Sequence, residues 1–325
     1  MANTGRPANV PSMTSPRTST RSVSLTDMGL LLFLGAVWGG AYLFFRIAAP
    51  EVGPVWTAEI RLLIGATALA LVAGRRALPV VRTRLRDFVV VGAMFSALPF
   101  SLLAFASLTL PTGFGALLNA STPLFTALLG VVLLGQTLRP RAVFGLAIGV
   151  AAVFVLVGWS PLAMGPELIV ASLAAMAAAM SYAFAGTFVR RRLHDVGGLE
   201  LATGQLAFGA LVLMPFALLS GAPGVPSAAG AASLLAVGLV STALAWPIFF
   251  RVMSRTTPTV ASTVTFIVPA FAITWGGLVL AEPVGPELLA GFGLILVSLV
   301  LVLGLRVPLP DVARRSRSRP AIATA

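Results

Sequence analysis

The sequence predicts an all-α polytopic membrane protein whose ten transmembrane helices form two inverted five-helix repeats. Hydrophobic residues make up 58% of the 325 residues and charged residues only 10%, whereas soluble domains hold about 25% charged residues. Apolar runs of about 20 residues, the length that crosses a bilayer, recur along nearly the whole chain. They leave no room for a soluble catalytic domain, and the lipid bilayer is the predicted surrounding.

Apolar windows bounded by Arg, Pro and Gly define the ten spans. The first five are residues 30–47, 55–74, 88–108, 113–135 and 142–159, and the second five are 168–189, 201–219, 231–250, 258–280 and 284–305. The predicted division of the chain follows from them, with a first repeat over 27–160 and a second over 161–306.

The two ends of the chain are predicted to be tails. Residues 1–26 are rich in Ser, Thr, Pro and Arg and hold no acidic residue, a composition typical of disorder. An organellar transit peptide has a similar composition and stays an alternative. Residues 307–325 form the second, basic tail.

The Arg residues decide the orientation of the spans. All 22 basic residues are Arg, and basic residues beside span ends stay on the cytoplasmic side. Outside the spans they occur only in the two tails and in alternate loops, around 75–86, 139–141, 190–192 and 251–255. Both termini are therefore predicted to be cytoplasmic. This topology accounts for the formal charge of +12 without a nucleic-acid partner.

Several classes of chemistry lack their residues in this chain. With no Cys and a single His, the sequence offers no disulfide, no thiolate metal site and no Cys nucleophile. It has no Lys and thus no phosphate-binding P-loop for ATP. We therefore expect a protein that is not an enzyme and needs no cofactor or metal. The absence of Lys and Cys beside heavy use of Ala, Arg, Gly and Val is typical of a GC-rich bacterium, which predicts the inner membrane.

The two halves of the chain are related in sequence. Nearly constant offsets align several polar, aromatic and glycine positions: Trp38 with Tyr182, Arg46 with Arg190, Arg61 with Gln205, Gly92 with Gly238, Ser96 with Thr242, Pro123 with Pro269 and Gln136 with Glu282. Because each half has an odd number of spans, the second enters the membrane in the opposite direction. Inverted repeats of this kind give secondary transporters their two mirror-related conformations.

Motifs in both halves carry a family resemblance. They are Ala36-Val-Trp-Gly39 followed by Arg46, residues 115–126, Leu133-Leu-Gly-Gln136, Ser181-Tyr182, residues 263–271 and Leu280-Ala-Glu-Pro283. Their order resembles the drug/metabolite transporter superfamily and, within it, the ten-span carriers with two EamA domains. The resemblance implies an exporter of amino acids or related compounds, with a cavity between the first, third, fourth, sixth, eighth and ninth spans. The family often has an acidic residue where this chain has Gln136. At the aligned position of the second half, this chain does have an acidic residue, Glu282.

Small and polar residues share one face of the fourth and ninth spans. Asn119 and Thr122, with Thr265 in the ninth span, are predicted to bind substrate, and Pro123 and Pro269 are predicted hinges. Asn119 is the sharpest candidate, because a buried amide is costly unless it is hydrogen-bonded. The alternative interpretation, that these small residues only let helices approach, stays open.

Aromatic and hydroxyl residues at helical spacing extend the candidate site to Trp38, Tyr42, Tyr182, Thr242 and Trp246. They are predicted to stack on an organic substrate or to close a gate, although such side chains also serve as packing or interfacial anchors.

Three charged residues lie in the outer parts of spans. Glu59 is the candidate for proton coupling, whereas Arg61 stays open between a functional and a structural role. Arg46 is expected to be structural, paired with Glu59 or Glu51. Outside the spans, Glu282 is expected to cap a helix.

The function predicted from the sequence is secondary transport, as an exporter of small metabolites such as amino acids, by alternating access. A passive channel or facilitator is one alternative, and a non-transporting membrane sensor or assembly factor is another. The sequence leaves monomer and homodimer equally open.

Overall fold

The computed structural model describes residues 24–135, 137–159, 165–255 and 264–303. Helices dominate this part of the chain, and none of it forms a strand. The first half contains α1 Leu25–Val52, α2 Pro54–Thr83, α3 Leu85–Val91, the π-helix η1 Gly92–Ala97, α4 Leu98–Ala106, α5 Thr112–Asn119, α6 Thr122–Leu134 and α7 Pro140–Gly158. The second half contains α8 Pro166–Arg192, α9 Gly198–Leu219, α10 Ala228–Leu235, the π-helix η2 Ala236–Leu244, α11 Ala245–Arg255, α13 Val264–Leu280 and α14 Pro286–Leu303.

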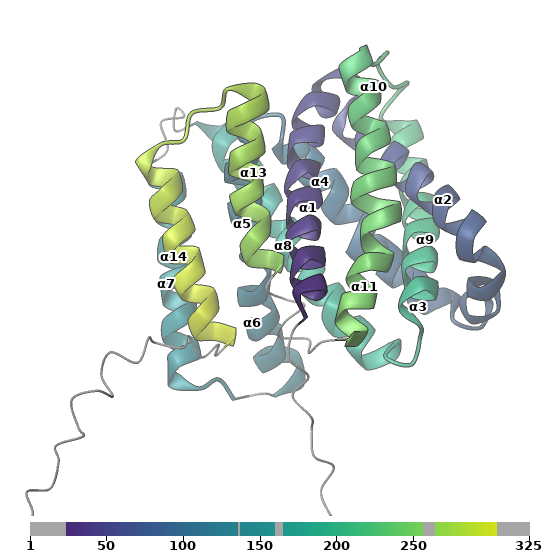
Figure 1. The fold of residues 1–325 in the computed structure, drawn as a ribbon, viewed down its shortest axis with the longest axis horizontal. Coiled ribbons are helices and arrows are strands. Elements are labelled where there is room, and N and C mark those ends of the chain that lie inside the picture. Colours follow the sequence, from purple (N-terminus) through teal and green to yellow (C-terminus); the bar gives the residue numbers. More distant parts are fainter. Residues whose placement is uncertain (1–23, 136, 160–164, 256–263, 304–325) are drawn as a thin grey trace, which may run out of the picture.

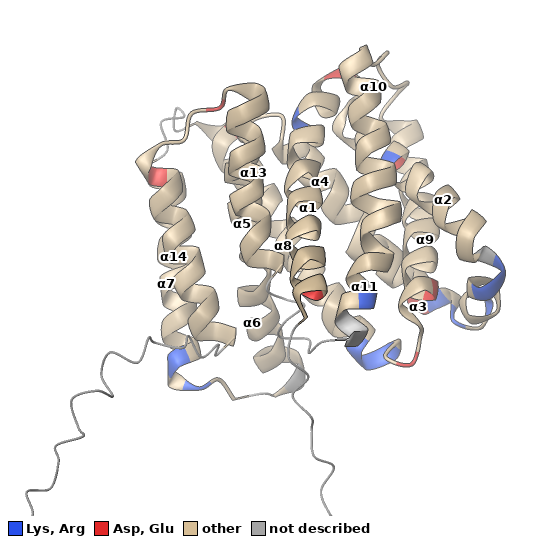
Figure 2. Ribbon diagram, viewed as in Figure 1, with Lys and Arg blue, Asp and Glu red and all other residues tan. Residues whose placement is uncertain are grey.

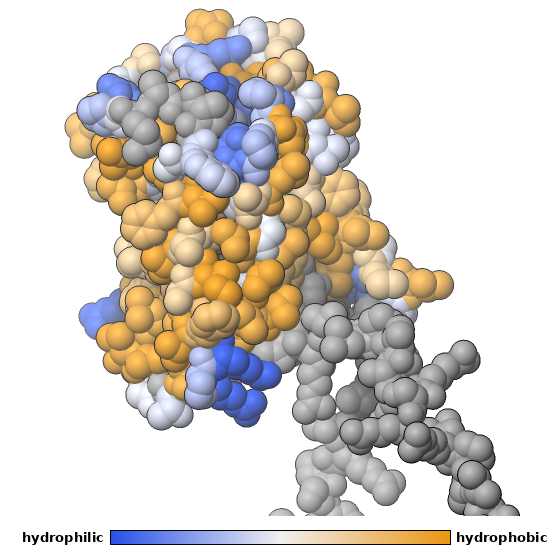
Figure 3. Space-filling model, turned by 90° about the vertical axis from the view of Figure 1, so that its left-hand side faces the viewer, coloured by the Kyte–Doolittle hydropathy of each residue, from blue (hydrophilic) through white to orange (hydrophobic). Residues whose placement is uncertain are grey.

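The predicted ten-span fold is confirmed. Within the described residues, nine helical stretches are long and apolar enough to cross a membrane, and α13 is a shorter apolar helix. The predicted ninth span also included 258–263, which lie outside the described residues. Large apolar side chains such as Phe154 and Leu211 face outwards, with 73% and 66% of their surface exposed. Figure 3 shows a hydrophobic band on one face of the molecule between two more hydrophilic ends.

Several helices begin or end away from their predicted bounds, the first two helices among them. The first starts at Leu25, because Ser24 and Asp27 form a capping box in which the Ser24 hydroxyl accepts a hydrogen bond from the Asp27 amide. Residues 25 and 26 therefore belong to the helix and not to the predicted tail. The second runs on to Thr83 through the Arg residues after the span. Figure 2 shows the Arg residues of the loops gathered along the lower edge of the bundle.

Two π-helices stand at matching places in the two repeats. η1 and η2 interrupt the third and eighth spans and include the aligned residues Gly92 and Gly238. The wider turn of a π-helix is frequent at functional sites. The other half contacts both segments through backbone carbonyls: Trp38 Nε1 donates to the Ser241 oxygen at 3.1 Å, and the Ser181 hydroxyl donates to the Met94 oxygen at 2.6 Å.

The halves pack crosswise, each second span against the π-helix of the opposite half. A Cβ added at Gly92 in η1 would lie 2.6 Å from the Gly209 nitrogen in α9. At the related contact, a Cβ at Gly65 in α2 would lie 2.7 Å from Thr242 Cγ2 in η2. The absent side chains let the helices approach closely, as small residues do in membrane bundles. Figure 1 shows α2 and α9 side by side and α7 beside α14 at the opposite end of the molecule.

The fourth span is broken near its middle. α5 ends at Asn119 and α6 begins at Thr122, with Pro123 in its first turn, where the missing N–H of proline costs nothing. Pro269, its counterpart, lies inside the continuous helix α13. The two related prolines therefore have different local structures, and their role as hinges stays a prediction.

Candidate transport site

The predicted site residues of α1, α5, α8 and η2–α11 gather around one buried side chain, Arg61. Only 5% of Arg61 is exposed, and its Nε donates a hydrogen bond to the Thr242 hydroxyl at 2.8 Å. The guanidinium lies over the Phe100 ring, 3.6 Å from its centroid. It also lies near Tyr42 and Tyr182. The structure thus makes Arg61 the centre of a site from which the sequence prediction had left it out.

The charge of Arg61 has no acidic partner within the described residues. The ion pairs found there involve Arg46, Arg84 and Arg192 instead. A buried Arg within a membrane helix is costly when no acidic side chain balances its charge. A cation over an aromatic ring recovers about 2 kcal/mol when both are desolvated. The remaining cost marks Arg61 as a functional candidate.

Asn119 and Tyr42 form the second polar pair of the site. Their side chains lie close to each other, and the buried Asn119 Oδ1 has no hydrogen-bond partner in the described structure. Thr122 stays beside them, because its hydroxyl donates to the Asn119 carbonyl at 2.7 Å across the break in the span. An acceptor left open in a buried place is available to a donor on a ligand.

Aromatic side chains line the site on the side of α11. We call the set formed by Trp38, Phe95, Tyr182, Trp246 and Phe249 the aromatic cluster. Neighbouring rings in it have centroids 5.3 to 6.0 Å apart, within the range of favourable aromatic pairs. Phe95 and Phe249 were missing from the sequence prediction. Tertiary packing brings Phe95 to Trp246, whereas Phe249 lies three residues after Trp246 on the same helix, a spacing that the sequence itself displays. The rings touch one another, so a substrate enters between them only when they move apart.

The other predicted residues lie apart from this cluster. Glu59 is fully buried, and neither of its carboxyl oxygens has a hydrogen-bond partner among the described residues. It is two positions from Arg61 and so points to a different face of α2. Thr265 is partly buried in the first turn of α13, and Pro269 is buried one turn later.

A polar network joins the two halves at the end of the bundle away from the Arg-bearing loops. Glu282 accepts hydrogen bonds from the Thr112 backbone nitrogen at 2.8 Å and from its hydroxyl at 3.1 Å, and so caps α5. Arg46 Nε lies 3.8 Å from Glu282, and its Nη1 donates to the Ser107 carbonyl at 2.8 Å. We call Arg46, Ser107, Thr112 and Glu282 the outer network.

Two sequence expectations are decided by this network. Glu282 caps a helix as expected, but the helix belongs to the opposite half. The expected partner of Arg46 was wrong: it pairs with Glu282, and Glu51 instead accepts hydrogen bonds from the Ser227 nitrogen and hydroxyl, each at 2.8 Å. Helix packing between the halves, and not proximity along the chain, selects these partners.

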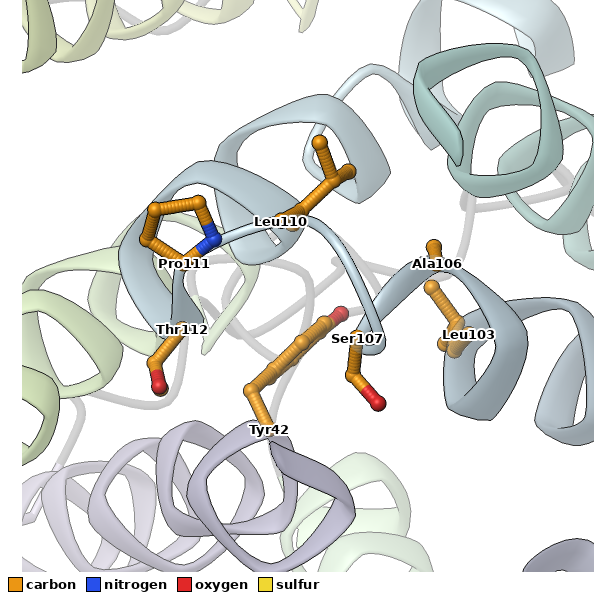
Figure 4. Close-up of a pocket in the computed structure, with 8 residues that line it drawn as sticks. Tyr42, Leu103, Ala106, Ser107, Leu110, Pro111 and Thr112 are labelled. Atoms are coloured by element: carbon orange, nitrogen blue, oxygen red, sulfur yellow. The ribbon is translucent and has the colours of Figure 1, made fainter. Parts of the chain in front are cut away.

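A small recess lies directly beneath the outer network. It has a volume of about 10 Å³, about enough for one water molecule. Figure 4 shows the Tyr42 ring rising from α1 between Thr112 on one side and Ser107 on the other. Tyr42 thus contacts both the recess and, through Asn119, the centre of the site.

Exposed ion pairs join the halves at the opposite end. Arg84 Nη1 donates to Asp195 Oδ1 at 2.7 Å, and Arg192 Nε lies 3.4 Å from Asp87. The hydrogen bond from Arg84 lowers the pKa of Asp195 below its ordinary value. Elsewhere in the described residues, no group of three His, Asp or Glu side chains is placed to hold a metal ion.

Two inverted helical repeats that enclose a buried polar and aromatic centre define the class of polytopic membrane transporters. The chain belongs to the EamA-like transporter family, which matches residues 27–158 and 169–304 and so covers both halves.

Curated proteins agree with this assignment, and a solved structure shares the fold. The chain is 23% identical over 261 residues to "Uncharacterized transporter YoaV" of Bacillus subtilis, covering 78% of this chain and 89% of the relative. It is 27% identical over 279 residues to "Probable terminal-alkyne amino-acid exporter" of Streptantibioticus cattleyicolor, covering 84% and 91%. One solved crystal structure has the same fold, with a TM-score of 0.60 and 20% identity over 85% of this chain and 96% of the other.

Proposed function

We propose that the protein is a secondary transporter that exports small metabolites, amino acids or related compounds among them, by alternating access. The observation that carries the proposal is the crossed packing of two inverted repeats around Arg61, Asn119 and the aromatic cluster. In such folds one half rocks against the other around a site near the middle of the membrane. The name of the relative described as an amino-acid exporter supports the direction and the kind of cargo.

The proposed location is the inner membrane of a bacterium, with both termini in the cytoplasm. The Arg-bearing loops support this orientation, since they gather at one end of the bundle. The native chain has no Cys, so single-Cys variants report the topology directly. We expect a membrane-impermeant maleimide added to intact cells to label Ala222→Cys and to leave His194→Cys unlabelled. The reverse pattern contradicts the proposed orientation.

Flux through purified protein in liposomes tests the transport function. We expect a panel of amino acids, nucleosides, polyamines and cationic drugs to include at least one compound that is carried. Asn119→Ala and Trp246→Ala are expected to lower that flux about tenfold or more, the loss that follows removal of one hydrogen bond or one stacking surface. Absence of flux for every compound contradicts the carrier, and unchanged flux in both variants contradicts the site.

Energy coupling separates a carrier from a passive facilitator. We propose Glu59 as the proton-coupling residue, because a buried carboxyl group without a hydrogen-bond partner in the described structure is a typical proton carrier in membrane proteins. An imposed proton gradient is expected to drive accumulation by the wild type, and Glu59→Gln is expected to abolish that dependence. Accumulation by Glu59→Gln with the dependence of the wild type contradicts this role.

A further inference from the structure

We propose that Arg61 binds the carboxylate of the transported compound, and that this compound is a small amphipathic monocarboxylate. The inference rests on the proposed transport function and names its cargo. The carboxylate contacts the free edge of the guanidinium, and the apolar part of the compound lies against the aromatic cluster.

The first support is that only part of the Arg61 guanidinium has a partner. Its Nε is engaged with Thr242, and the face of its guanidinium lies on Phe100. The described structure shows no further hydrogen bond from the two terminal nitrogens. These nitrogens form the fork that binds a carboxylate through two parallel hydrogen bonds. Thr242 and Phe100 thus hold the fork in one orientation before the ligand arrives.

The second support comes from the other repeat, in which the equivalent helix contact is made without a charged residue. Gln205 aligns with Arg61, and Ser96 aligns with Thr242. Gln205 lies one turn before Gly209, where an added Cβ would be 2.9 Å from Ser96 Cβ, so this second pair occupies the related contact. Both residues are buried, with 1% and 0% of their surface exposed. A neutral side chain is therefore sufficient to pack α9 against η1, and the charge at Arg61 needs another reason.

The third support is the continuity between the charge and an apolar surface. Thr242, which holds Arg61, lies one turn before Trp246 in the aromatic cluster. Tyr182 belongs to that cluster and also lies near Arg61. A ligand with its anion on Arg61 thus has aromatic rings within one helical turn. This arrangement fits a compound that is charged at one end and apolar at the other.

A single positive charge also limits the charge of the ligand. Arg46 is the other Arg within a span, and it is already engaged with Glu282 and two backbone carbonyls. A phosphate near neutral pH carries about two negative charges, which one guanidinium does not balance. The chemistry thus favours a carboxylate over a phosphate.

Matched probes test the proposal on the purified full-length protein. We use 3-phenylpropionate, its amide, 3-phenylpropylamine and phenyl phosphate, with binding followed by tryptophan fluorescence, since Trp38 and Trp246 lie in the aromatic cluster. We expect the wild type to bind the acid about 10- to 100-fold more tightly than the amide, the range expected for a charge-assisted hydrogen-bonded pair. Arg61→Gln is expected to bind the two equally.

Two variants control for a structural effect. Gln is the residue at the related position of the second repeat, so Arg61→Gln is expected to fold, which a monodisperse elution profile and an unchanged helical spectrum verify. Arg84→Gln removes the same charge from an exposed corner and is expected to keep the full preference for the acid. Arg61→Lys is expected to keep part of it, because an ammonium supplies the charge without the fork.

Each contrary result overturns the proposal in a recognisable way. Equal binding of acid and amide by the wild type, an unchanged preference in Arg61→Gln, or tighter binding of phenyl phosphate or of the amine would each reject it. Flux in liposomes separates this failure from failure of the proposed function. Transport of the amine or the amide, but not of the acid, rejects the carboxylate site and keeps the transporter. Absence of flux for all four probes and for the wider panel rejects both.

Discussion

The two halves of the molecule build the same contact twice, and only one of the two contacts carries a charge. In the first half Arg61 reaches across to Thr242 in η2, and its Nε is satisfied there. At the related contact, Gln205 of the second half faces Ser96 in η1 of the first half, and Gln205 Nε2 and Ser96 Oγ are buried without partners in the described structure. Symmetric packing therefore supports an asymmetric site. The repeat provides the scaffold, and single substitutions within one half provide the chemistry.

The largest expected effect concerns the glycines at the crossed contacts. A Cβ at Gly92 would lie 2.6 Å from the Gly209 backbone nitrogen, whereas a Cβ at Gly238 would lie 2.6 Å from the side chain of Ile64. The Cβ of Ile64 is bonded directly to its backbone, so neither neighbour can turn aside, and we expect Gly92→Ala and Gly238→Ala to cost about 3 kcal/mol each. Melting temperatures in detergent measure both. A clearly smaller loss in one of the two variants would contradict the equivalence of the two contacts.

The next largest effect on stability is expected at a hydroxyl group that is hydrogen-bonded, in contrast to one that is not. Thr242→Val keeps the shape of the side chain but leaves the buried Arg61 Nε without its acceptor, at an expected cost of about 2 kcal/mol. Ser96→Ala removes a hydroxyl that has no hydrogen-bond partner in the described structure and is expected to change stability by less than about 0.5 kcal/mol. Thermal unfolding of the two variants side by side checks the difference. A larger loss for Ser96→Ala would contradict the contrast drawn between the halves.

A smaller effect is expected at the outer network. Glu282→Gln keeps one acceptor for the Thr112 amide but removes the charge beside Arg46 and the α5 N-terminus. Loss of a charged cap costs about 1 kcal/mol, and we expect that decrease in unfolding free energy. The same substitution at Glu167, an exposed acidic residue in the first turn of α8, is the matched control. An identical loss there would mean that only the helix dipole is involved.

The smallest effect is a dependence on pH at the exposed end. The pKa of Asp195 is lowered in the folded protein by its hydrogen bond with Arg84. The pair therefore contributes stability above the ordinary pKa of an aspartate, and this contribution is lost as the pH falls through the lowered value. Asp195→Asn is expected to remove this step from the melting temperature measured against pH. Because the pair is exposed, salt should weaken the step, and a step that is insensitive to salt would contradict the assignment.

The sequence predicted the architecture better than the site. Hydropathy and Arg placement are properties of whole segments, so the spans and the inverted repeat were visible without coordinates. Arg61 was harder, because its distance along α2 from the outer end allowed a snorkelling side chain. Only the approach of η2 through Gly65 turns it towards Thr242. The π-helices had no signal in the sequence beyond the glycines that begin or line them.

Partners of charged residues were the least predictable feature. Arg46 was expected to pair within its own half, because a sequence shows only which residues are close along the chain. Its actual partner, Glu282, is brought close by the packing of α13 against α5 and α1. Interactions between the halves thus depend on tertiary packing, which no local pattern encodes.

The outer network also bears on the resting state of the proposed cycle. The sequence repeat aligns Arg46 and Glu282 with Arg190 and Gln136, so the aligned pair contains one charge in place of two. A seal made by Arg46 and Glu282 therefore gains an ionic contribution of about 0–1 kcal/mol for a partly exposed pair, which the aligned residues do not supply. Under the proposed cycle, a bias of this size favours the inward-open form by up to about fivefold. In that cycle, cargo on the cytoplasmic side binds a form that is already populated. Cargo on the outer side binds with an apparent affinity that is lowered in proportion to the small population of the outward-open form.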